Sequence, residues 1–296
     1  MQHTMLADLK ELLIFKYKKL LKEIFMNEKR IIKMTKNPNT ISSLVKDFKD
    51  LGLKSGDVII AHFAMSKIGW ISGGAEAVIL ALKEVVSDQG TIVMSAQSAS
   101  NSDPEDWENP AVPKEWFDTI RNSIPAYNPK TTPTRGIGVI PELFRTFPGV
   151  IRSNHPHASF TSFGKLKNEI ITNHELSPMF GINSPLGNLY KIKNSKILLV
   201  GTTFETCTAL HLSETFVYSK KNQKICSAML VDGKREWVCF DDYDYNIDLF
   251  PEIERLYFKS QLPYTKGKVG QANTYLLPYN ELIDFGTNYI KNYLKT

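Results

Sequence analysis

A histidine and a glutamate one helical turn apart are the residues with the clearest chemical use in this 296-residue sequence. His211 and Glu214 follow the apolar run 196–200, and their three-residue spacing places them on one face of a helix. A carboxylate beside an imidazole orients the ring, and an oriented imidazole is suited to accept a proton as a general base. The segment lacks the second histidine of a His-Glu-x-x-His zinc helix. We therefore expect His211 and Glu214 to take part in proton transfer.

The other histidines leave a metal site open as an alternative. Six histidines occur, and four of them fall between residues 155 and 211, a clustering that favours a functional site without assigning roles. His155 and His157 have the spacing of metal ligands, but Pro156 separates them and no third ligand is evident. A metal-dependent hydrolase that uses His62, His155 and His157 is therefore the rival class of enzyme. We expect no bound metal.

A glycine-rich turn at residues 69–74 precedes a segment with helical periodicity. Glycines at such a turn let backbone N–H groups approach a phosphate, and the helix N-terminus favours negative charge. The turn matches neither the Walker loop nor the dinucleotide-binding glycine pattern. It is either an anion site or a purely structural turn.

Acidic residues are concentrated in residues 236–254, which hold seven Asp or Glu and no Lys or Arg. Such a segment is either a solvated loop or a surface that pairs with ammonium groups. Asp241, Asp242 and Asp244 are the residues that we expect to contact an amine substrate. Nucleic acid is disfavoured as a partner, because these charges repel phosphate.

The elements that must position these residues follow an α/β pattern. An apolar strand at 57–62, a helix at 75–87 and a strand at 91–95 predict a parallel βαβ unit. Further elements are a helix at 41–51 capped by Thr40, a helix near Pro141 and a strand at 196–200. Residues 225–231 and 236–242 predict an antiparallel hairpin that turns at Asp232-Gly233. The polar segment 99–135 is too long for a simple connector, so we expect it to shape a site. The predicted fold is a mixed sheet with a parallel βαβ core, an antiparallel addition and helices on both faces.

The first 36 residues carry the whole formal net charge of +5, since they hold nine Lys or Arg against four Asp or Glu. Residues 5–30 predict an extra amphipathic helix that packs on the domain or on a partner subunit. A membrane-surface helix is the alternative. We expect an N-terminal extension over 1–36 and one domain over 37–296. The non-enzyme rival is an adaptor protein built around helix 5–30.

Three cysteines, Cys207, Cys226 and Cys239, give an odd count without close spacing. This pattern predicts free, buried thiols rather than a disulfide framework. Free thiols favour a reducing cytoplasm. No apolar run before residue 37 is long enough to span a membrane.

From about residue 40 to its C-terminus, the sequence resembles the aminoglycoside 3-N-acetyltransferase family, also called the antibiotic N-acetyltransferase family. The resemblance rests on an ordered set of segments: 51–58, 65–74, 132–142, 152–156 with Ser159, His174 with Gly181 and 184–186, 208–214, and 267–272. The N-terminal extension lies outside it, and the segment 99–135 carries no distinctive mark of the family.

The resemblance implies transfer of an acyl group from coenzyme A to a primary amine, in a direct ternary complex without a metal. It implies that His174 is the active-site histidine, with His211 and Glu214 as neighbours that orient it or the amine. Backbone N–H groups are expected to stabilise the oxyanion. The residues that it places at acetyl-CoA are Ser66, Ser72, Gly73, Gly74, Thr134, Arg135 and Ser153. The resemblance implies that the acceptor is an aminoglycoside or another amino sugar, alternatively a nucleotide-linked amino sugar of surface-polysaccharide synthesis. A homo-oligomer remains open.

Overall fold

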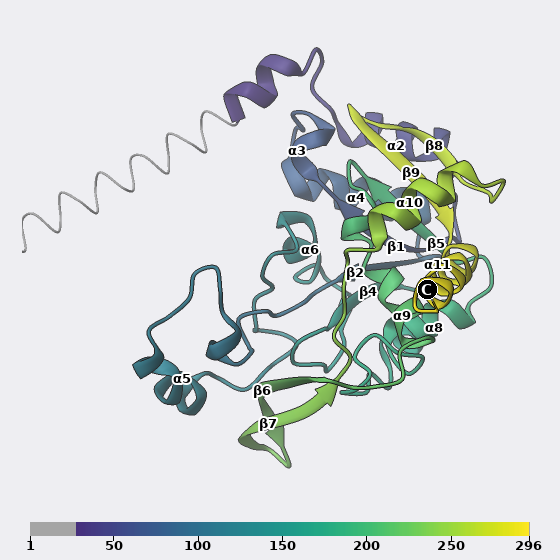
Figure 1. The fold of residues 1–296 in the computed structure, drawn as a ribbon. Helices are drawn as coiled ribbons and strands as arrows, with labels where there is room; N and C mark the ends of the chain where they lie inside the picture. The colour runs from purple at the N-terminus through teal and green to yellow at the C-terminus, as the bar shows by residue number, and fades with distance from the viewer. Residues whose placement is uncertain (1–27, 296) are drawn as a thin grey trace, which may run out of the picture.

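A seven-stranded mixed sheet organises the chain in the computed structural model, which describes residues 28–295 (Figure 1). The strand order is β3-β4-β2-β1-β5-β9-β8. Central strand β1 pairs in parallel with β2 and β5, and the outer pairings are antiparallel. The strand bounds are β1 Val58–Phe63, β2 Thr91–Ser95, β3 Ile151–Arg152, β4 Phe160–Gly164, β5 Lys196–Val200, β8 Thr265–Val269 and β9 Ala272–Pro278. The predicted parallel βαβ unit is confirmed.

Helices cover both faces of this sheet, as predicted. Helices α2, α4 and α6 supply residues to the hydrophobic cluster on one face, whereas α7 to α11 supply residues to the cluster on the other. The helix bounds are α2 Ile41–Asp50, α3 Met65–Ile68, α4 Gly74–Val86, α5 Phe117–Ser123, α6 Val139–Phe144, α7 Lys167–Ile171, α8 Pro185–Lys191, α9 His211–Thr215, α10 Phe250–Lys259 and α11 Tyr279–Tyr293. Short 3-10 helices are η1 Pro104–Asp106, η2 Lys114–Trp116, η3 Phe204–Thr206 and η4 Thr208–Leu210.

The predicted cap of α2 is present, because the Ser43 N–H donates to the Thr40 side chain.

Strand β1 shows why two separate clusters exist. Side chains alternate between the faces of a strand. Ile59 and Ala61 therefore pack with α2, α4 and α6, whereas Val58 and Ile60 pack with α8 to α11. By the same alternation His62, at the carboxyl end of β1, lies on the face that α9 covers. This places it on the same side of the sheet as His211.

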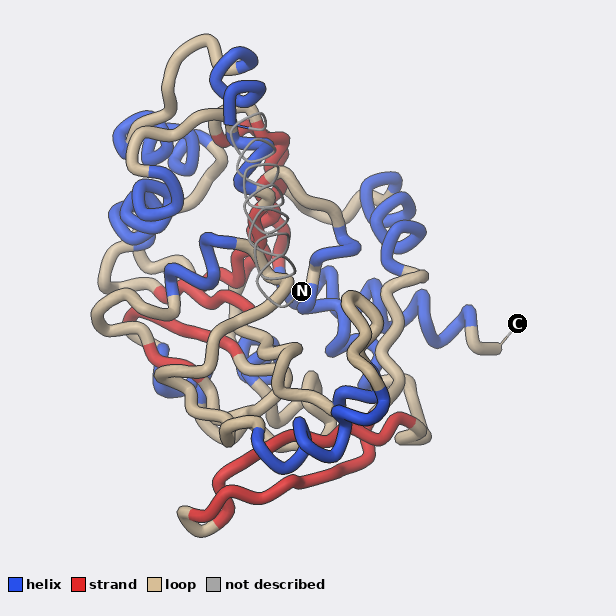
Figure 2. Tube along the Cα trace, turned by 90° about the vertical axis from the view of Figure 1, so that its left-hand side faces the viewer, coloured by secondary structure: helices blue, strands red, loops and turns tan. Residues whose placement is uncertain are grey.

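The predicted hairpin forms a separate two-stranded sheet of β6 Gln223–Val231 and β7 Lys234–Asp242, at one end of the molecule (Figure 2). Asp232 and Gly233 both have positive φ values, of 49° and 77°, as the tight turn requires. The hairpin projects from the main sheet beside the segment 99–135.

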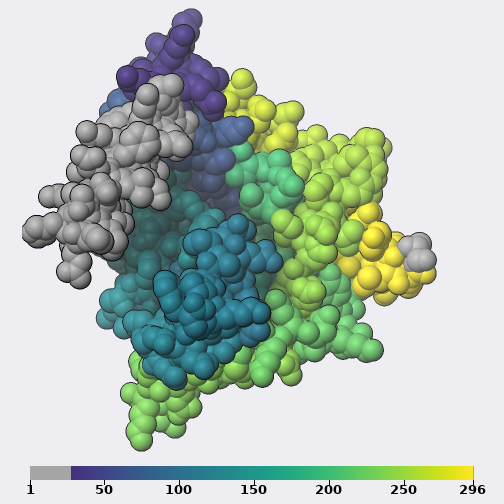
Figure 3. Space-filling model, turned by 60° about the vertical axis from the view of Figure 1, so that its left-hand side comes forward, coloured from purple at the N-terminus to yellow at the C-terminus, as the bar shows by residue number. Residues whose placement is uncertain are grey.

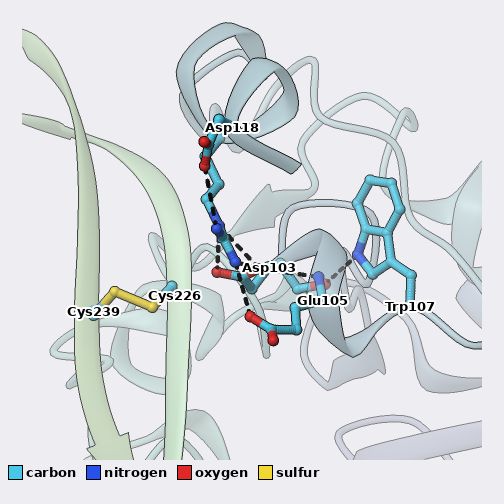
Figure 4. A network of polar contacts seen from close by, with 8 residues as sticks. Asp103, Glu105, Trp107, Asp118, Cys226 and Cys239 are labelled. Carbon is cyan, nitrogen blue, oxygen red and sulfur yellow. Dashed lines mark hydrogen bonds and ion pairs between the residues drawn. A yellow bond between two sulfur atoms is a disulfide. The ribbon is translucent and has the colours of Figure 1, made fainter. Parts of the chain in front are cut away.

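The prediction of free thiols at Cys226 and Cys239 is wrong, because these two residues form a disulfide (Figure 4). The hairpin register places them directly opposite each other, with their Cα atoms 4.1 Å apart. The two cysteines are 13 residues apart along the chain, and the hairpin turn lies midway between them. Cys207 is buried and free, as expected. The prediction of a reducing cytoplasm was argued from free thiols, and the disulfide removes that argument. The compartment therefore stays a prediction.

Residues 28–34 are helical. The rest of the helix predicted over 5–30 lies outside the described residues, so its packing stays a prediction, as does a domain boundary at residue 37. Within the described chain, no helix is both long and apolar enough to span a membrane.

Candidate active site

His211 and Glu214 lie on the same face of the short helix α9, as their spacing predicts. Nδ1 of His211 lies 2.5 Å from Oε2 of Glu214, and the two side chains are 13% and 1% exposed. An ionised carboxylate only accepts hydrogen bonds, so Nδ1 carries the proton of this contact. Nε2 is then left as the proton acceptor of a neutral ring.

Glu214 is held in place by three different donors. Its second oxygen, Oε1, accepts hydrogen bonds from the Tyr218 hydroxyl at 3.0 Å and from the backbone N–H of Asn246 at 2.8 Å. A buried carboxylate needs such partners, because burial without them is costly. Both oxygens are therefore used, and the carboxylate fixes the orientation of His211. Phe180 stacks on the His211 ring at 4.9 Å between centroids and adds to this constraint.

His211 borders a pocket of about 450 Å³, here called the His211 pocket. The carboxyl ends of β1 and β2, the loop after β5 and the glycine pair Gly136 and Gly138 line it. The carboxyl ends of parallel strands are where α/β sheets commonly bind ligands. His62 is the penultimate residue of β1. Ser95 ends β2 and donates a hydrogen bond to the Thr208 hydroxyl at 3.1 Å. The pocket thus combines an oriented imidazole with hydroxyl groups from distant parts of the sequence.

His174 has a different environment from His211. Its Nε2 donates to the carbonyl oxygen of Met179 at 2.8 Å, and its Nδ1 accepts from the Ser153 hydroxyl at 2.9 Å. Burial lowers the pKa of His174 to about 4, so the ring is neutral near pH 7. Both ring nitrogens are engaged by the protein itself. His174 is also not among the described residues that line the His211 pocket.

Three residues predicted at the cofactor make mainly internal contacts. Ser153 is buried, and its hydroxyl also accepts a hydrogen bond from the backbone N–H of Phe160. The hydroxyl and N–H of Thr134 both donate to Glu142. Arg135 is exposed, and its backbone N–H donates to the Gln97 carbonyl oxygen. Of these three residues, Ser153 is buried, Thr134 is half-buried and Arg135 is exposed.

The predicted glycine turn lies beyond the carboxyl end of β1. Gly73 adopts a left-handed conformation at φ 85°, which glycine tolerates, and it begins the 13-residue helix α4 without a side-chain cap. The first N–H groups of a helix have no partner within it, so this end can accept an anion. Ser66, Ser72 and Gly73 are exposed there.

The acids predicted to bind an amine do not gather at the His211 pocket. Asp242 is fully buried, where it accepts hydrogen bonds from the Met179 and Tyr243 backbone N–H groups and from the Tyr245 hydroxyl. Asp241 and Asp244 are exposed, and neither lines that pocket in the described chain. The acid that lines it is Glu205, on η3.

A second pocket of about 320 Å³, here called the Trp107 pocket, lies beneath the segment 99–135. Its lining includes Asp106, Trp107, Glu108 and Arg135. Arg121 fastens this segment by binding Asp103, Glu105 and Asp118 (Figure 4). Arg235 of β7 donates to the carbonyl oxygens of residues 121 and 124, so the hairpin supports the segment. Figure 3 shows 99–135 standing forward beside the hairpin. Residues of this segment line the Trp107 pocket, and the expectation that it shapes a functional site stays a prediction.

The histidines of the rival hydrolase do not converge. Both ring nitrogens of His155 have backbone partners: Nδ1 accepts from residues 157 and 158, and Nε2 donates to the Leu176 carbonyl oxygen. His157 lines the Trp107 pocket and His62 the His211 pocket. Among residues 28–295, no three His, Cys, Asp or Glu side chains form a group that could hold a metal ion. Burial raises the pKa of Cys207 to about 12, so this thiol is a poor nucleophile.

A sequence profile described as aminoglycoside 3-N-acetyltransferase matches residues 60–291 of the chain. The chain belongs to this family. It is therefore an acyltransferase, and the mixed α/β fold is that of the family's solved members.

Members of the aminoglycoside 3-N-acetyltransferase family resemble the chain over most of its length. The SPbeta prophage-derived aminoglycoside N(3')-acetyltransferase-like protein YokD of Bacillus subtilis (strain 168) is 44% identical, covering 89% of this chain and 97% of YokD. The crystal structure of YokD superposes with a TM-score of 0.87, covering 90% of this chain and 99% of that one. Aminoglycoside N(3)-acetyltransferase IX of Micromonospora chalcea is 33% identical, covering 91% of this chain and all of that protein. A binary complex of AAC-IIIb with CoASH is 28% identical, covers 87% of this chain and 98% of that one, and has a TM-score of 0.77.

Within this family fold, sequence reasoning left several pocket residues unassigned. His62, Ser95, Thr208 and Glu205 line the His211 pocket but had no predicted role at an acceptor or cofactor site. One signal was available for two of them, because His62 and Ser95 are polar residues at the carboxyl ends of predicted parallel strands. Thr208 lies in the segment 208–214 that carries the family resemblance, whereas nothing local marks Glu205.

Proposed function

We propose that the chain transfers an acetyl group from acetyl-CoA to a primary amine of an aminoglycoside or related amino sugar, with His211 as the general base. The observation that carries this proposal is the pairing of His211 with Glu214 at the edge of a pocket formed by β1, β2 and the loop after β5. Because Glu214 fixes the proton on Nδ1, Nε2 of His211 is available to the substrate. His174 has no such free nitrogen, since both are bonded within the protein. We therefore assign the base to His211 and a structural role to His174.

The reaction needs a base because an ammonium group has no lone pair with which to attack a thioester. An imidazole that titrates near neutrality can accept a proton as the nitrogen attacks. The ring can return that proton to the departing thiolate, which completes the transfer directly between two bound substrates. Holding both substrates in one pocket supplies much of the acceleration through proximity.

The acetyl-CoA side of the site is proposed at the glycine turn and at Arg135. The N-terminus of α4, with Ser66, Ser72, Gly73 and Gly74 near it, offers backbone N–H groups to the anionic phosphates. Arg135 is an exposed cation directly before Gly136, which lines the His211 pocket, and Arg135 itself lines the neighbouring Trp107 pocket. The complex of AAC-IIIb with CoASH supports coenzyme A as the co-substrate of this fold.

The amine side of the site is proposed at Glu205, which lines the His211 pocket, and at the segment 99–135, whose Asp106 and Glu108 line the neighbouring Trp107 pocket. Carboxylates of this kind pair with the ammonium groups of a polycationic acceptor. A nucleotide-linked amino sugar is the alternative acceptor. The negative charges of these acids would repel its phosphates, so an aminoglycoside-like polyamine is the preferred acceptor.

Thiol release from acetyl-CoA tests this proposal. The full chain is incubated with a panel of aminoglycosides and, separately, with nucleotide-linked amino sugars, and acetylated products are identified by mass spectrometry. We expect acetylation of a polyamine sugar that depends on His211. Absence of amine-dependent thiol release across both panels would overturn the proposal.

A further inference from the structure

The His211 pocket contains a second histidine whose environment differs from that of His211. His62 is 8% exposed and lies at the carboxyl end of β1. Its Nε2 is buried and has no hydrogen-bond partner in the described chain. Buried polar atoms almost always have partners, so each exception calls for an explanation. Three such atoms occur among the described residues, and two of them, on His62 and Thr202, belong to residues that line this one pocket.

The absence of a carboxylate partner distinguishes the two histidines chemically. Glu214 accepts a hydrogen bond from Nδ1 of His211 and fixes that ring, whereas Nε2 of His62 has no partner among the described residues. Burial alone lowers the pKa of His62 to about 4, so its imidazole is neutral near pH 7. A neutral imidazole has one N–H to donate and is a weak base. Such a ring suits the role of a hydrogen-bond donor to developing negative charge.

The reaction assigned above needs one acceptor of a proton and one donor to an oxygen. When the amine attacks the thioester, the C–N bond forms and the carbonyl π electrons move onto oxygen. His211 takes the amine proton. When the tetrahedral species collapses, the carbonyl re-forms, the C–S bond breaks, and the thiolate takes the proton from His211. The oxygen is therefore negative only transiently, and it requires a donor that does not itself ionise.

We propose that His62 is a catalytic residue that donates its imidazole N–H to the thioester carbonyl oxygen and stabilises the oxyanion. This inference rests on the proposed acyl transfer. It explains the position of His62, which β1 places on the face of the sheet covered by α9. It also gives the buried Nε2 of His62, which has no partner in the described chain, a hydrogen bond to make with the bound thioester.

Variants of His62 test this assignment in the full chain. His62→Phe keeps a ring and removes the hydrogen bond, so kcat should fall by about a hundredfold, the usual effect of losing one oxyanion donor. His62→Asn should recover a large part of that loss, and the KM for acetyl-CoA should change by less than about threefold. The pH at which kcat/KM reaches half its maximum should stay where it is in the wild type. Ser162→Ala is the matched control, because Ser162 carries the third unpartnered buried atom and does not line the pocket.

A second readout does not depend on any acceptor. Isotope-edited infrared spectra of acetyl-CoA labelled with ¹³C at the carbonyl report hydrogen bonding to that oxygen in the binary complex. The C=O band should lie at lower frequency with the wild type than with His62→Phe. Equal band positions, an unchanged kcat in His62→Phe, or a loss of rate that Asn does not recover would each overturn the role of His62. Failure of the wild type to acetylate any amine would instead overturn the proposed function, whereas the infrared comparison would still decide whether His62 donates to the carbonyl.

Discussion

Nδ1 of His211 donates a hydrogen bond to Oε2 of Glu214 at 2.5 Å, and the carboxylate that receives it is 1% exposed. The Glu214 carboxylate is almost fully buried, whereas its partner His211 lines the His211 pocket. The Tyr218 hydroxyl and the Asn246 backbone N–H also donate hydrogen bonds to this carboxylate and keep it in position. The imidazole is thereby fixed in one tautomer, with Nε2 as its acceptor.

Removing the base should abolish most of the activity without removing the co-substrate. We expect His211→Ala to lower kcat by about a hundredfold to ten-thousandfold, the range for loss of a general base, while the Kd for coenzyme A stays within about threefold. Glu214→Gln should act in the same direction but less strongly, because it keeps the shape and loses the charge that orients the ring. Steady-state kinetics and calorimetric titration with coenzyme A measure the two effects. A His211→Ala enzyme with nearly wild-type kcat would contradict the assignment.

The variant His174→Ala separates the two histidines. The family resemblance predicts at least a roughly hundredfold loss of transfer for this change, whereas the assignment of the base to His211 predicts a loss of stability. The truncation leaves a cavity and frees the Ser153 hydroxyl and the Met179 carbonyl, so unfolding should require about 2–4 kcal/mol less free energy. Urea denaturation and activity at 10 °C distinguish the outcomes. A fully stable but inactive His174→Ala protein would return the role of base to His174.

Residues at the glycine turn are expected to act on co-substrate binding alone. Ser66→Ala and Arg135→Ala should raise the KM for acetyl-CoA by about three- to tenfold and leave kcat nearly unchanged, as for lost contacts of similar strength in ground and transition states. The Arg135→Ala effect should shrink at high salt, since an exposed cation acts on phosphate through screened charge. Ser55→Ala is a suitable control, because Ser55 is exposed and its hydroxyl is hydrogen-bonded to that of Ser87. An unchanged KM in both variants would remove the turn from the co-substrate site.

Acid should destabilise the fold through buried histidines. His62 and His174 have pKa values lowered to about 4 by burial, whereas an unfolded histidine has a pKa near 6.5. Between these values the unfolded chain binds more protons, so the free energy of unfolding falls as the pH falls. Each residue should remove about 1.5 kcal/mol between pH 6.5 and pH 5. Denaturation curves at the two pH values measure the slope, and His62→Phe should reduce it. A slope that is the same in wild type and variant would contradict the burial of a neutral ring.

The Cys226–Cys239 disulfide gives a prediction about thiol counts. Alkylation of denatured, unreduced protein should label one cysteine, Cys207, and labelling after reduction should reach all three. Cys226→Ser with Cys239→Ser should lower the free energy of unfolding by about 2–3 kcal/mol, since the bond closes a short loop. Finding three reactive thiols before reduction would show that the bond does not form under the conditions of purification.

The sequence determined those features in which the interacting residues are close along the chain. The spacing of His211 and Glu214 sets their shared helix face, and Asp232-Gly233 sets the hairpin turn. Helix α4 and its flanking strands follow from periodicity and glycines. The disulfide was within reach of the same reasoning, because Cys226 and Cys239 lie at equal distances on either side of that turn.

Tertiary structure decided what lies around these local pairs. Ser95 and Thr208 are 113 residues apart, yet their hydroxyls meet in the pocket because β1 lies between β2 and β5 in the sheet. Likewise, only packing shows that both ring nitrogens of His174 are hydrogen-bonded within the protein. Nε2 of His62, in contrast, has no hydrogen-bond partner in the described chain. A residue's type gives its chemical capacity, which the sequence reports directly. Its use depends on burial and on neighbours brought from elsewhere in the chain, and only the folded arrangement supplies these.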